Sequence, residues 1–334
     1  MSTPHTMKAT ILNNPGPDSE LATLAATPVP AVPDGFVLVK NAFAGINYVD
    51  IYVRTGQYPI PKSKDVIIGQ EAAGTIAAVS PLASSQYNLK DGDRVVWLFQ
   101  GGYAEYTAVP ARQVIKIPDG VKNEDAVAAF LVGLTALSLV NDAFPVQKGD
   151  KVLVHAAAGG LGLLLIQVLK QKGATVIGTA GGAEKCQLAK RFGADFVVDY
   201  RSEVNWVEEV TKFTAGEGVD VVYDGVGKDT WAGSLDVTKL FGRVVFIGNA
   251  SGPIPPINTD LLSEKNITVM RPKLRTYLEV GDRYVRYAQE ILALIETGKL
   301  TVLKHHKMYS LEEVAQAHED LKGRRTTGRL LVKI

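Results

Sequence analysis

The 334-residue sequence has a single cysteine, Cys186, so no disulfide can form within the chain. One thiol also cannot supply the four thiolates of a structural zinc site. The sequence lacks an excess of either charge, because 36 Lys and Arg are balanced by 35 Asp and Glu to a formal net charge of +1. Composition therefore predicts neither a nucleic-acid footprint nor a polybasic membrane patch.

Long apolar segments are lacking as well. The apolar helical pattern after Gly162 is interrupted at Gln167 and Lys170, so we expect no membrane-spanning helix. The N-terminal region has no charged segment followed by an apolar one, and we expect no signal peptide. Cytoplasm is therefore the expected location.

Motifs for metal binding or nucleophilic catalysis are lacking too. The five histidines show no ligand spacing, and His155 is interpreted as a strand-end residue beside a glycine turn. No G-x-S-x-G elbow or paired-carboxylate motif occurs. We expect no metal. Without a Lewis acid, oxidation of ordinary alcohols is difficult, whereas reduction of an already electrophilic substrate remains easy.

Proline usage divides the chain. Eleven of the 16 prolines lie in residues 1–125, where the sequence predicts short strands at Lys8–Leu12, Val37–Ala42, Ala73–Val79, Arg94–Leu98 and Val114–Ile117. The next region alternates strands and helices, with strands predicted at Lys151–His155, Thr175–Thr179, Phe196–Asp199, Val219–Asp224, Arg243–Ile247 and Ile267–Met270. This alternation is typical of a doubly wound parallel sheet.

We therefore predict an α/β fold with two domains. Residues 1–125 and 274–334 form a β-rich domain, and residues 126–273 form the doubly wound domain. A long amphipathic helix near Arg283–Ile295 and a final strand, Gly328–Ile334, are expected to return the chain to the first domain.

A turn of small residues is the strongest functional motif. It runs from His155 to Gly162, between an apolar strand and a helix. Glycines allow a pyrophosphate to approach the backbone, and the free N–H groups of the helix start attract the anion. Gly159 and Gly162 occupy the second and third positions of G-x-G-x-x-G, whereas Ala157 stands in the first. We interpret the turn as a dinucleotide site rather than a plain strand–helix connection.

The region after the second strand favours NADP(H) over NAD(H). Glu184 has the spacing of a ribose-binding carboxylate, yet it follows two glycines and falls in the first turn of a helix, where it complements the helix dipole. Gly181 at the strand end leaves room for a 2′-phosphate, which Lys185 and Tyr200 are placed to bind. The alternatives are a solvated helix face for Lys185 and a packing role for Tyr200.

A series of motifs occurs in a fixed order along the chain. The motifs are Ala44-Gly45-Ile46-Asn47-Tyr48-Val49-Asp50, Arg54-Thr55-Gly56-Gln57-Tyr58-Pro59, Gly69-Gln70-Glu71-Ala72-Ala73-Gly74, Gly133-Leu134-Thr135-Ala136, the turn 155–162, Tyr223–Trp231, Gly248–Gly252 and Met270-Arg271-Pro272. Together they resemble the zinc-free medium-chain dehydrogenase/reductases of the NADPH:quinone oxidoreductase (zeta-crystallin-like) type. The resemblance covers nearly the whole chain and implies a GroES-like catalytic domain, a Rossmann domain and a homodimer.

The resemblance also implies roles for single residues. Asn47 and Gln70 stand where zinc-dependent relatives have metal ligands, and Glu71 is expected to pair structurally. The residues implied at the cofactor are Tyr48, Val49, Asp50, Thr135, Gly159, Gly160, Leu161, Gly162, Gly181, Lys185, Tyr200, Val226, Asn249, Ser251, Arg275, Thr276, Tyr277, Arg324 and Gly328. For each later loop residue, turn geometry is the alternative interpretation.

The implied reaction is hydride transfer from NADPH to a quinone. Asn47 is the predicted hydrogen-bond donor to the developing oxyanion, with Tyr52 and Tyr58 as substrate-side hydroxyls and aromatic walls; simple packing is the alternative for both tyrosines. Two other functions remain as alternatives: an NADPH-dependent alkenal or enone reductase on the same scaffold, and an NADPH-sensing protein that binds AU-rich RNA.

Overall fold

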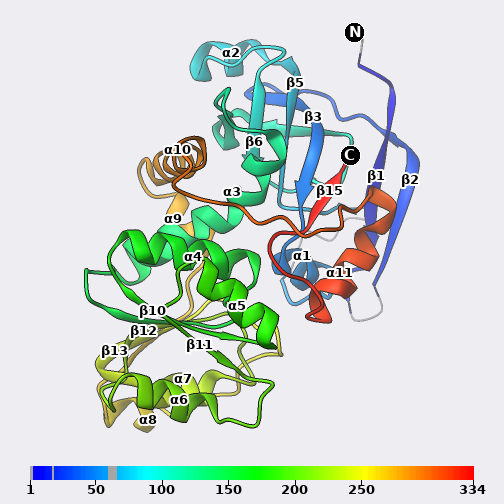
Figure 1. Cartoon of the computed structure of the whole chain (residues 1–334). Coiled ribbons are helices and arrows are strands. Elements are labelled where there is room, and N and C mark those ends of the chain that lie inside the picture. The colour runs from blue at the N-terminus through cyan, green and yellow to red at the C-terminus, as the bar shows by residue number, and fades with distance from the viewer. Residues whose placement is uncertain (1–2, 17–18, 59–65) are drawn as a thin grey trace. The chain divides into compact units, whose positions relative to one another are not determined.

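The computed structural model describes residues 3–16, 19–58 and 66–334, so Pro59 of the second motif lies outside the described residues. The chain divides into two compact units, which we call unit 1 (Met1–Leu131 and Ala288–Ile334) and unit 2 (Val132–Tyr287). Both crossings lie inside helices, α3 (Asn123–Ser138) and α10 (Arg283–Glu296) (Figure 1). The domain limits inferred from the sequence, 125/126 and 273/274, precede these crossings and stay a prediction.

Unit 1 is built from two antiparallel sheets. In the smaller sheet, β1 (Thr6–Asn13) pairs with β2 (Glu20–Pro28) and β4 (Val66–Ile67). The larger sheet has the order β15 (Leu331–Lys333), β3 (Phe36–Gly45), β5 (Glu71–Val79), β6 (Arg94–Leu98) and β8 (Val114–Lys116), and β7 (Tyr106–Pro110) also pairs with β3. The pairing of β15 with β3 confirms that the C-terminal strand returns to the first domain.

The helices of unit 1 are short. They are α1 (Tyr48–Arg54), α2 (Pro81–Tyr87) and α11 (Val314–Lys322), with single 3₁₀ turns η1 (Ala111–Gln113) and η3 (Leu311–Glu313). Trp97, Tyr103 and Tyr309 are among the largest fully buried side chains, and they pack in one apolar cluster. Strands β2 and β7 were not predicted, because alanine and threonine dilute the apolar alternation of the first and the second is short and ends in proline.

Unit 2 is a six-stranded sheet in which every pair is parallel. Its order is β11 (Phe196–Asp199), β10 (Thr175–Ala180), β9 (Lys151–Val154), β12 (Val219–Asp224), β13 (Thr238–Phe246) and β14 (Thr268–Met270). Helices α4 (Gly160–Gln171) and α5 (Ala183–Arg191) cover one face, and α6 (Trp206–Phe213) and α7 (Trp231–Asp236) cover the other (Figure 1). Short helices α8 (Asp260–Ser263) and α9 (Leu274–Leu278) complete the unit. The predicted doubly wound sheet is confirmed.

Helix α3 and the π-helical turn η2 (Leu139–Ala143) form a longer apolar segment than the sequence led us to expect. Within the described residues, 123–143 is the one helix whose length and mean hydropathy of 1.7 would suit a membrane span. Its apolar window is 78% buried in the protein, however, so the hydropathy reflects a core helix.

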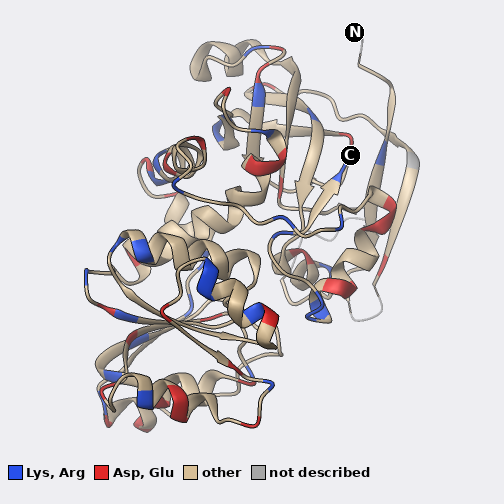
Figure 2. Ribbon diagram, in the orientation of Figure 1, with Lys and Arg blue, Asp and Glu red and all other residues tan. Residues whose placement is uncertain are grey.

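Charges of both signs are interspersed in each unit. Figure 2 shows blue and red segments alternating along the ribbons of unit 1 and of unit 2. The distribution agrees with the balanced composition.

Candidate functional site

The order of strands in unit 2 locates its ligand-binding edge. Strand β9 lies between β10 and β12, so the direction of the crossovers reverses between β9 and β12. Ligands of doubly wound sheets bind beside the carboxyl ends of the strands at such a reversal. The turn 155–159 follows β9 at this point and leads into α4, whose N-cap, Gly159, makes no side-chain capping bond.

The turn is closely packed, which explains its small residues. Ala156 has a positive φ of 52°, and the Ala157 N–H donates to the Thr179 carbonyl at 2.9 Å. A Cβ on Gly162 would lie 2.5 Å from the Ala156 carbonyl oxygen, so only glycine fits there. Helix α4 therefore starts directly against the turn, with the N–H groups of Gly160 and Leu161 in its first turn.

Ala157 replaces the first glycine of the motif because the space for its methyl group is provided on the next strand. A Cβ added to Gly178 of β10 would lie 2.7 Å from the Ala157 Cβ. Ala157 itself is fully buried. The methyl group thus occupies volume that a side chain at 178 would fill.

The adenosine end of the edge carries two cations and a phenol. A Cβ on Gly181 would lie 2.6 Å from the Tyr200 hydroxyl and 3.1 Å from Nε of Arg201. Burial lowers the pKa of Lys185, and the nearby Arg201 charge lowers it further. The Tyr200 hydroxyl and the Arg201 guanidinium therefore lie beside Gly181, and the charges of Arg201 and Lys185 repel each other. An anionic group at this position would relieve that repulsion, so the residues fit a phosphorylated adenosine ribose.

Asp199, at the end of β11, shapes this region through hydrogen bonds with the backbone. Its Oδ1 accepts the N–H of Gly182 at 2.7 Å and of Arg201 at 2.9 Å. These backbone hydrogen bonds lower the pKa of the Asp199 carboxyl. The carboxylate thus fixes the loops on either side of Gly181.

The loops that follow β12 and β13 are joined by hydrogen bonds. Asp224 ends β12, and its Oδ1 accepts the N–H of Val226 at 2.8 Å and of Gly227 at 3.0 Å. Ser251 joins the second loop to the first, because its N–H and hydroxyl donate to the Val226 carbonyl at 2.8 and 2.9 Å. Asn249 Oδ1 accepts from Arg271 at 3.1 Å. The structure thus brings Val226, Asn249 and Ser251 together.

The remaining predicted cofactor residues of unit 2 lie on helices. Arg275, Thr276 and Tyr277 belong to α9, and Thr135 belongs to α3. Burial and the charge of Asp142 raise the pKa of Tyr277, which places this phenol near the π-helical turn. Their contacts with a cofactor stay a prediction.

In unit 1, Asn47 belongs to a buried network of charges. Its Nδ2 donates to Glu71 Oε1 at 2.9 Å, and its Oδ1 accepts from Arg329 at 3.0 Å. Arg329 forms an ion pair with Glu71 at 2.5 Å, and the Leu131 N–H donates to the other Glu71 oxygen at 2.7 Å. Burial raises the pKa of Glu71, and the Arg329 charge opposes that shift. Glu71 thus pairs structurally, as expected.

The same network fills the space beside Gly45. A Cβ there would lie 2.8 Å from the nearest Arg329 nitrogen, so only glycine fits. The second Nδ2 proton of Asn47 faces the Gly45 carbonyl at 3.4 Å, a long and weak contact. This proton is the one that Asn47 can redirect to a substrate oxygen.

Asp50 is fully buried and supports Asn47. Its Oδ2 accepts the Asn47 N–H at 2.8 Å, as part of the capping box of α1, and the Tyr103 hydroxyl at 2.6 Å. Burial raises the pKa of Asp50 to about 7, and Oδ1 has no hydrogen-bond partner in the described part of the chain. Asp50 is buried, and its contact with a cofactor stays a prediction.

Tyr48, predicted at the cofactor, forms a continuous aromatic row with Tyr52 and Tyr58, which were predicted on the substrate side. The Tyr48 and Tyr52 ring centroids are 5.9 Å apart, and those of Tyr52 and Tyr58 are 5.3 Å apart. Tyr52 is buried and Tyr58 is half-buried, so packing accounts for much of both rings. Val49, next to Tyr48 in the first turn of α1, is half-buried.

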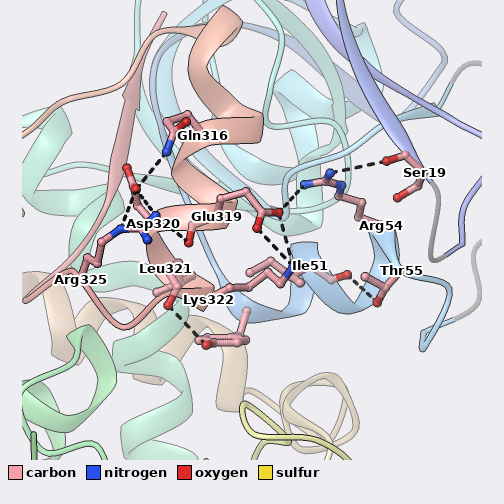
Figure 3. Close-up of polar contacts among 11 residues, drawn as sticks. Ser19, Ile51, Arg54, Thr55, Gln316, Glu319, Asp320, Leu321, Lys322 and Arg325 are labelled. Carbon is pink, nitrogen blue, oxygen red and sulfur yellow. Dashed lines mark hydrogen bonds and ion pairs between the residues drawn. The ribbon is translucent and has the colours of Figure 1, made fainter.

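Helix α1 is fixed by polar contacts with α11 (Figure 3). The Tyr48 hydroxyl donates to the Leu321 carbonyl at 3.4 Å, and Arg54 pairs with Glu319 at 3.5 Å. The loop after α11 contains Arg324, with a φ of 56°, and Gly328, with a φ of 65°. A Cβ on Gly328 would meet the Leu303 carbonyl, so this loop also requires its glycine.

Sequence reasoning missed several residues of these two regions. Arg329, Tyr103, Asp224 and Arg201 were not assigned roles. Arg329 and Tyr103 are buried polar residues whose partners lie far away in the sequence. Arg329 is 258 positions from Glu71, for example. The one available signal was a charged residue, Arg329, at the start of an apolar terminal strand. Within residues 3–16, 19–58 and 66–334, no three His, Cys, Asp or Glu side chains are grouped as metal ligands.

Comparison with known proteins agrees with this geometry. Residues 33–119 match the alcohol dehydrogenase GroES-like domain, and residues 160–290 match the zinc-binding dehydrogenase family. A probable quinone oxidoreductase of Schizosaccharomyces pombe is 41% identical over 95% of this chain and 94% of its own length. The Escherichia coli quinone oxidoreductase in complex with NADPH has a TM-score of 0.89 at 35% identity, covering 98% of this chain and all of that one. A mycobacterial protein in complex with NADPH has a TM-score of 0.91 at 37% identity with the same coverage.

Proposed function

This chain belongs to the quinone oxidoreductases of the medium-chain dehydrogenase/reductase family, and we infer from this membership that it reduces quinones with NADPH. The observation that carries the inference is that the relationship to quinone oxidoreductases extends over both units. These relatives favour quinone reduction over the alkenal reductase and RNA-binding alternatives. The substrate is accordingly a small molecule.

Bound NADPH supplies a hydride from C4 of its nicotinamide, and this hydride with one proton converts a quinone to a hydroquinone. The chain has to bind the dinucleotide, orient the acceptor and stabilise the oxyanion that develops on it. Because quinones accept electrons readily, a few hydrogen-bond donors suffice, and solvent can supply the proton.

Nucleotide binding falls to unit 2. The backbone N–H groups from Gly159 to Gly162 bind the pyrophosphate, and the helix dipole of α4 adds to this attraction. Lys185 and Tyr200 beside Gly181 bind the 2′-phosphate. The two later loops are hydrogen-bonded to each other through Val226 and Ser251, which supports their proposed role in binding the nucleotide.

Substrate binding falls to unit 1 in our proposal. Asn47 redirects the Nδ2 proton that faces the Gly45 carbonyl to the acceptor oxygen, while Glu71 and Arg329 hold the amide in place. Tyr52 and Tyr58 supply aromatic walls. The proposal is metal-free, since amides at 47 and 70 replace metal ligands and the Arg329 guanidinium occupies one side of Glu71. Metal analysis of the active enzyme checks this point.

We further propose a homodimer in the cytoplasm. The family resemblance supports the dimer, and the single cysteine suits a reducing compartment. Light scattering at several protein concentrations and fractionation of cells measure the two properties.

The test of the function is stopped-flow oxidation of NADPH with a panel of acceptors. We expect ortho- or para-quinones to accelerate the loss of NADPH absorbance, whereas enones and alkenals of similar size react much more slowly. Acceleration by enones without any by quinones would assign the chain to the alkenal reductases instead.

A further inference from the structure

A chain of four buried polar side chains crosses unit 2 directly beneath the pyrophosphate turn. Thr179 Oγ1 lies 2.8 Å from His155 Nδ1, and His155 Nε2 lies 3.1 Å from Ser234 Oγ. The Ser234 hydroxyl lies 2.8 Å from Asp224 Oδ2. All four residues are buried, and they come from the ends of β10, β9 and β12 and from α7.

The hydrogen bonds of this chain have one consistent direction. A carboxylate only accepts hydrogen bonds, so the Ser234 hydroxyl donates its proton to Asp224. Ser234 Oγ must then accept from His155, which places the imidazole proton on Nε2. Nδ1 is left as an acceptor and receives the Thr179 hydroxyl. His155 is therefore the neutral Nε2–H tautomer, the form that burial favours by lowering its pKa.

Each end of this hydrogen-bonded series holds backbone groups at the predicted nucleotide site. The Thr179 carbonyl accepts the N–H of Ala157, in the pyrophosphate turn, at 2.9 Å. Asp224 accepts the N–H groups of Val226 and Gly227 through its Oδ1. The imidazole lies between these two anchor points, and the Trp206 ring packs edge-on against it at 4.9 Å. His155 therefore sets the distance between the turn and the later loops.

We propose that His155 is a positioning residue, which aligns the pyrophosphate turn with the Val226–Ser251 loops through Thr179, Ser234 and Asp224. The proposal rests on the proposed function only in taking NADPH as the ligand of unit 2. The hydrogen-bonded series acts on backbone that would contact the part common to NADPH and NADH. Its loss therefore weakens the binding of both nucleotides by the same factor. The 2′-phosphate residues, in contrast, act on NADPH alone.

The first experiment compares Thr179→Val with Thr179→Ser. The valine has the shape of threonine but cannot donate to His155, whereas the serine keeps the hydroxyl. We expect Thr179→Val to raise the Kd of NADPH and of NADH by the same factor, roughly 5- to 50-fold, and Thr179→Ser to stay within about twofold of the parent protein. Thr211→Val, an identical change on the exposed face of α6, is the matched control.

Binding is measured by fluorescence titration without a quinone, so the result does not depend on whether quinones are the substrates. Unchanged Kd values with a lower Tm would overturn the proposal, because they would show a purely structural role. A rise for NADPH alone, or an equal rise in Thr179→Ser, would overturn it too.

The second experiment observes the hydrogen bonds of the parent protein directly. Imidazole ¹⁵N spectra of the histidine-labelled parent protein are expected to show that His155 has a protonated Nε2 and an unprotonated Nδ1 and does not titrate between pH 6 and 8. The signal is assigned by its absence in His155→Gln. A protonated Nδ1, or titration in that range, would overturn the assigned direction of the chain.

Discussion

Each unit contains a buried polar network, and the two networks neutralise their carboxyl groups in different ways. In unit 1, Glu71 is paired with a full positive charge on Arg329. In unit 2, Asp224 is surrounded by backbone N–H groups and hydroxyls, including Thr230 at 2.8 Å. Two cations of unit 2, Lys185 and Arg201, lie instead at the predicted ligand-binding edge of its sheet.

The two units therefore place their charged side chains differently. A buried ion pair holds a side chain such as Asn47 rigidly, but the removal of one partner leaves an uncompensated charge. Dipoles spread over several groups tolerate the loss of one donor better. Unit 1 thus uses charge internally to fix a donor, whereas unit 2 has Lys185 and Arg201 at the position that we propose for the 2′-phosphate.

The largest effect is expected from breaking the ion pair of unit 1. Arg329→Met leaves the buried Glu71 without its cation, and we expect a loss of about 3–5 kcal/mol in the free energy of unfolding. Urea denaturation measures it. Arg325→Met is the control, because its pair with Asp320 is exposed and is worth at most about 1 kcal/mol. An equal loss in both variants would contradict the distinction between the networks. Adding Glu71→Gln to Arg329→Met should recover part of the stability.

A somewhat smaller effect concerns the pH dependence of unit 1. Burial raises the pKa of Asp50 to about 7, compared with about 3.9 in an unfolded chain. Between these pH values the folded state holds a proton that the unfolded state has lost. The stabilisation is therefore complete below about pH 4 and is lost as the pH rises through 7, by about 2–4 kcal/mol.

Asp50→Asn should remove this slope from unfolding free energies measured between pH 4 and pH 8. Asp119→Asn, at an exposed position, should retain it. If Asp50→Asn keeps the slope of the parent protein, another group is responsible for it.

The smallest of the three effects concerns the positive charge of Lys185 in unit 2. Lys185→Ala should raise the KM for NADPH by about 10- to 100-fold, the range of a lost charge-assisted hydrogen bond, while the KM for NADH changes little. Lys190→Ala, at an exposed position on the same helix, is the control. Equal effects of Lys185→Ala on both nucleotides would remove Lys185 from the phosphate site.

The parallel sheet was predictable because its strands are apolar throughout and are separated by helices with clear ends. Strands β11 and β12 begin and end at the residues predicted. Strand β13 starts five residues before the predicted Arg243, since Thr238 pairs with Val219 across an irregular register. Pairing with a neighbour, rather than local pattern, decides such a boundary.

The candidate site was only partly predictable, for a similar reason. Local motifs identified Asn47, the glycine turn and Gly181, because each has a short sequence signature. Buried partners such as Arg329 and Tyr103 have none, as their role depends on a neighbour that folding brings close. The interpretation of His155 as a strand-end residue was right about its place but did not extend to its hydrogen bonds.

The fit of Ala157 against Gly178 has a consequence for how the motif varies between sequences. The two positions share one methyl-sized volume, so their residue types are not independent of each other. Gly178→Ala alone introduces a collision, and Ala157→Gly alone opens a void, whereas the two changes together exchange the position of the methyl group. A motif search that requires glycine at position 157 considers only the turn after β9. The space available to this turn also depends on residue 178 of β10. Reading both positions as one unit turns an apparent exception into a regular member of the pattern.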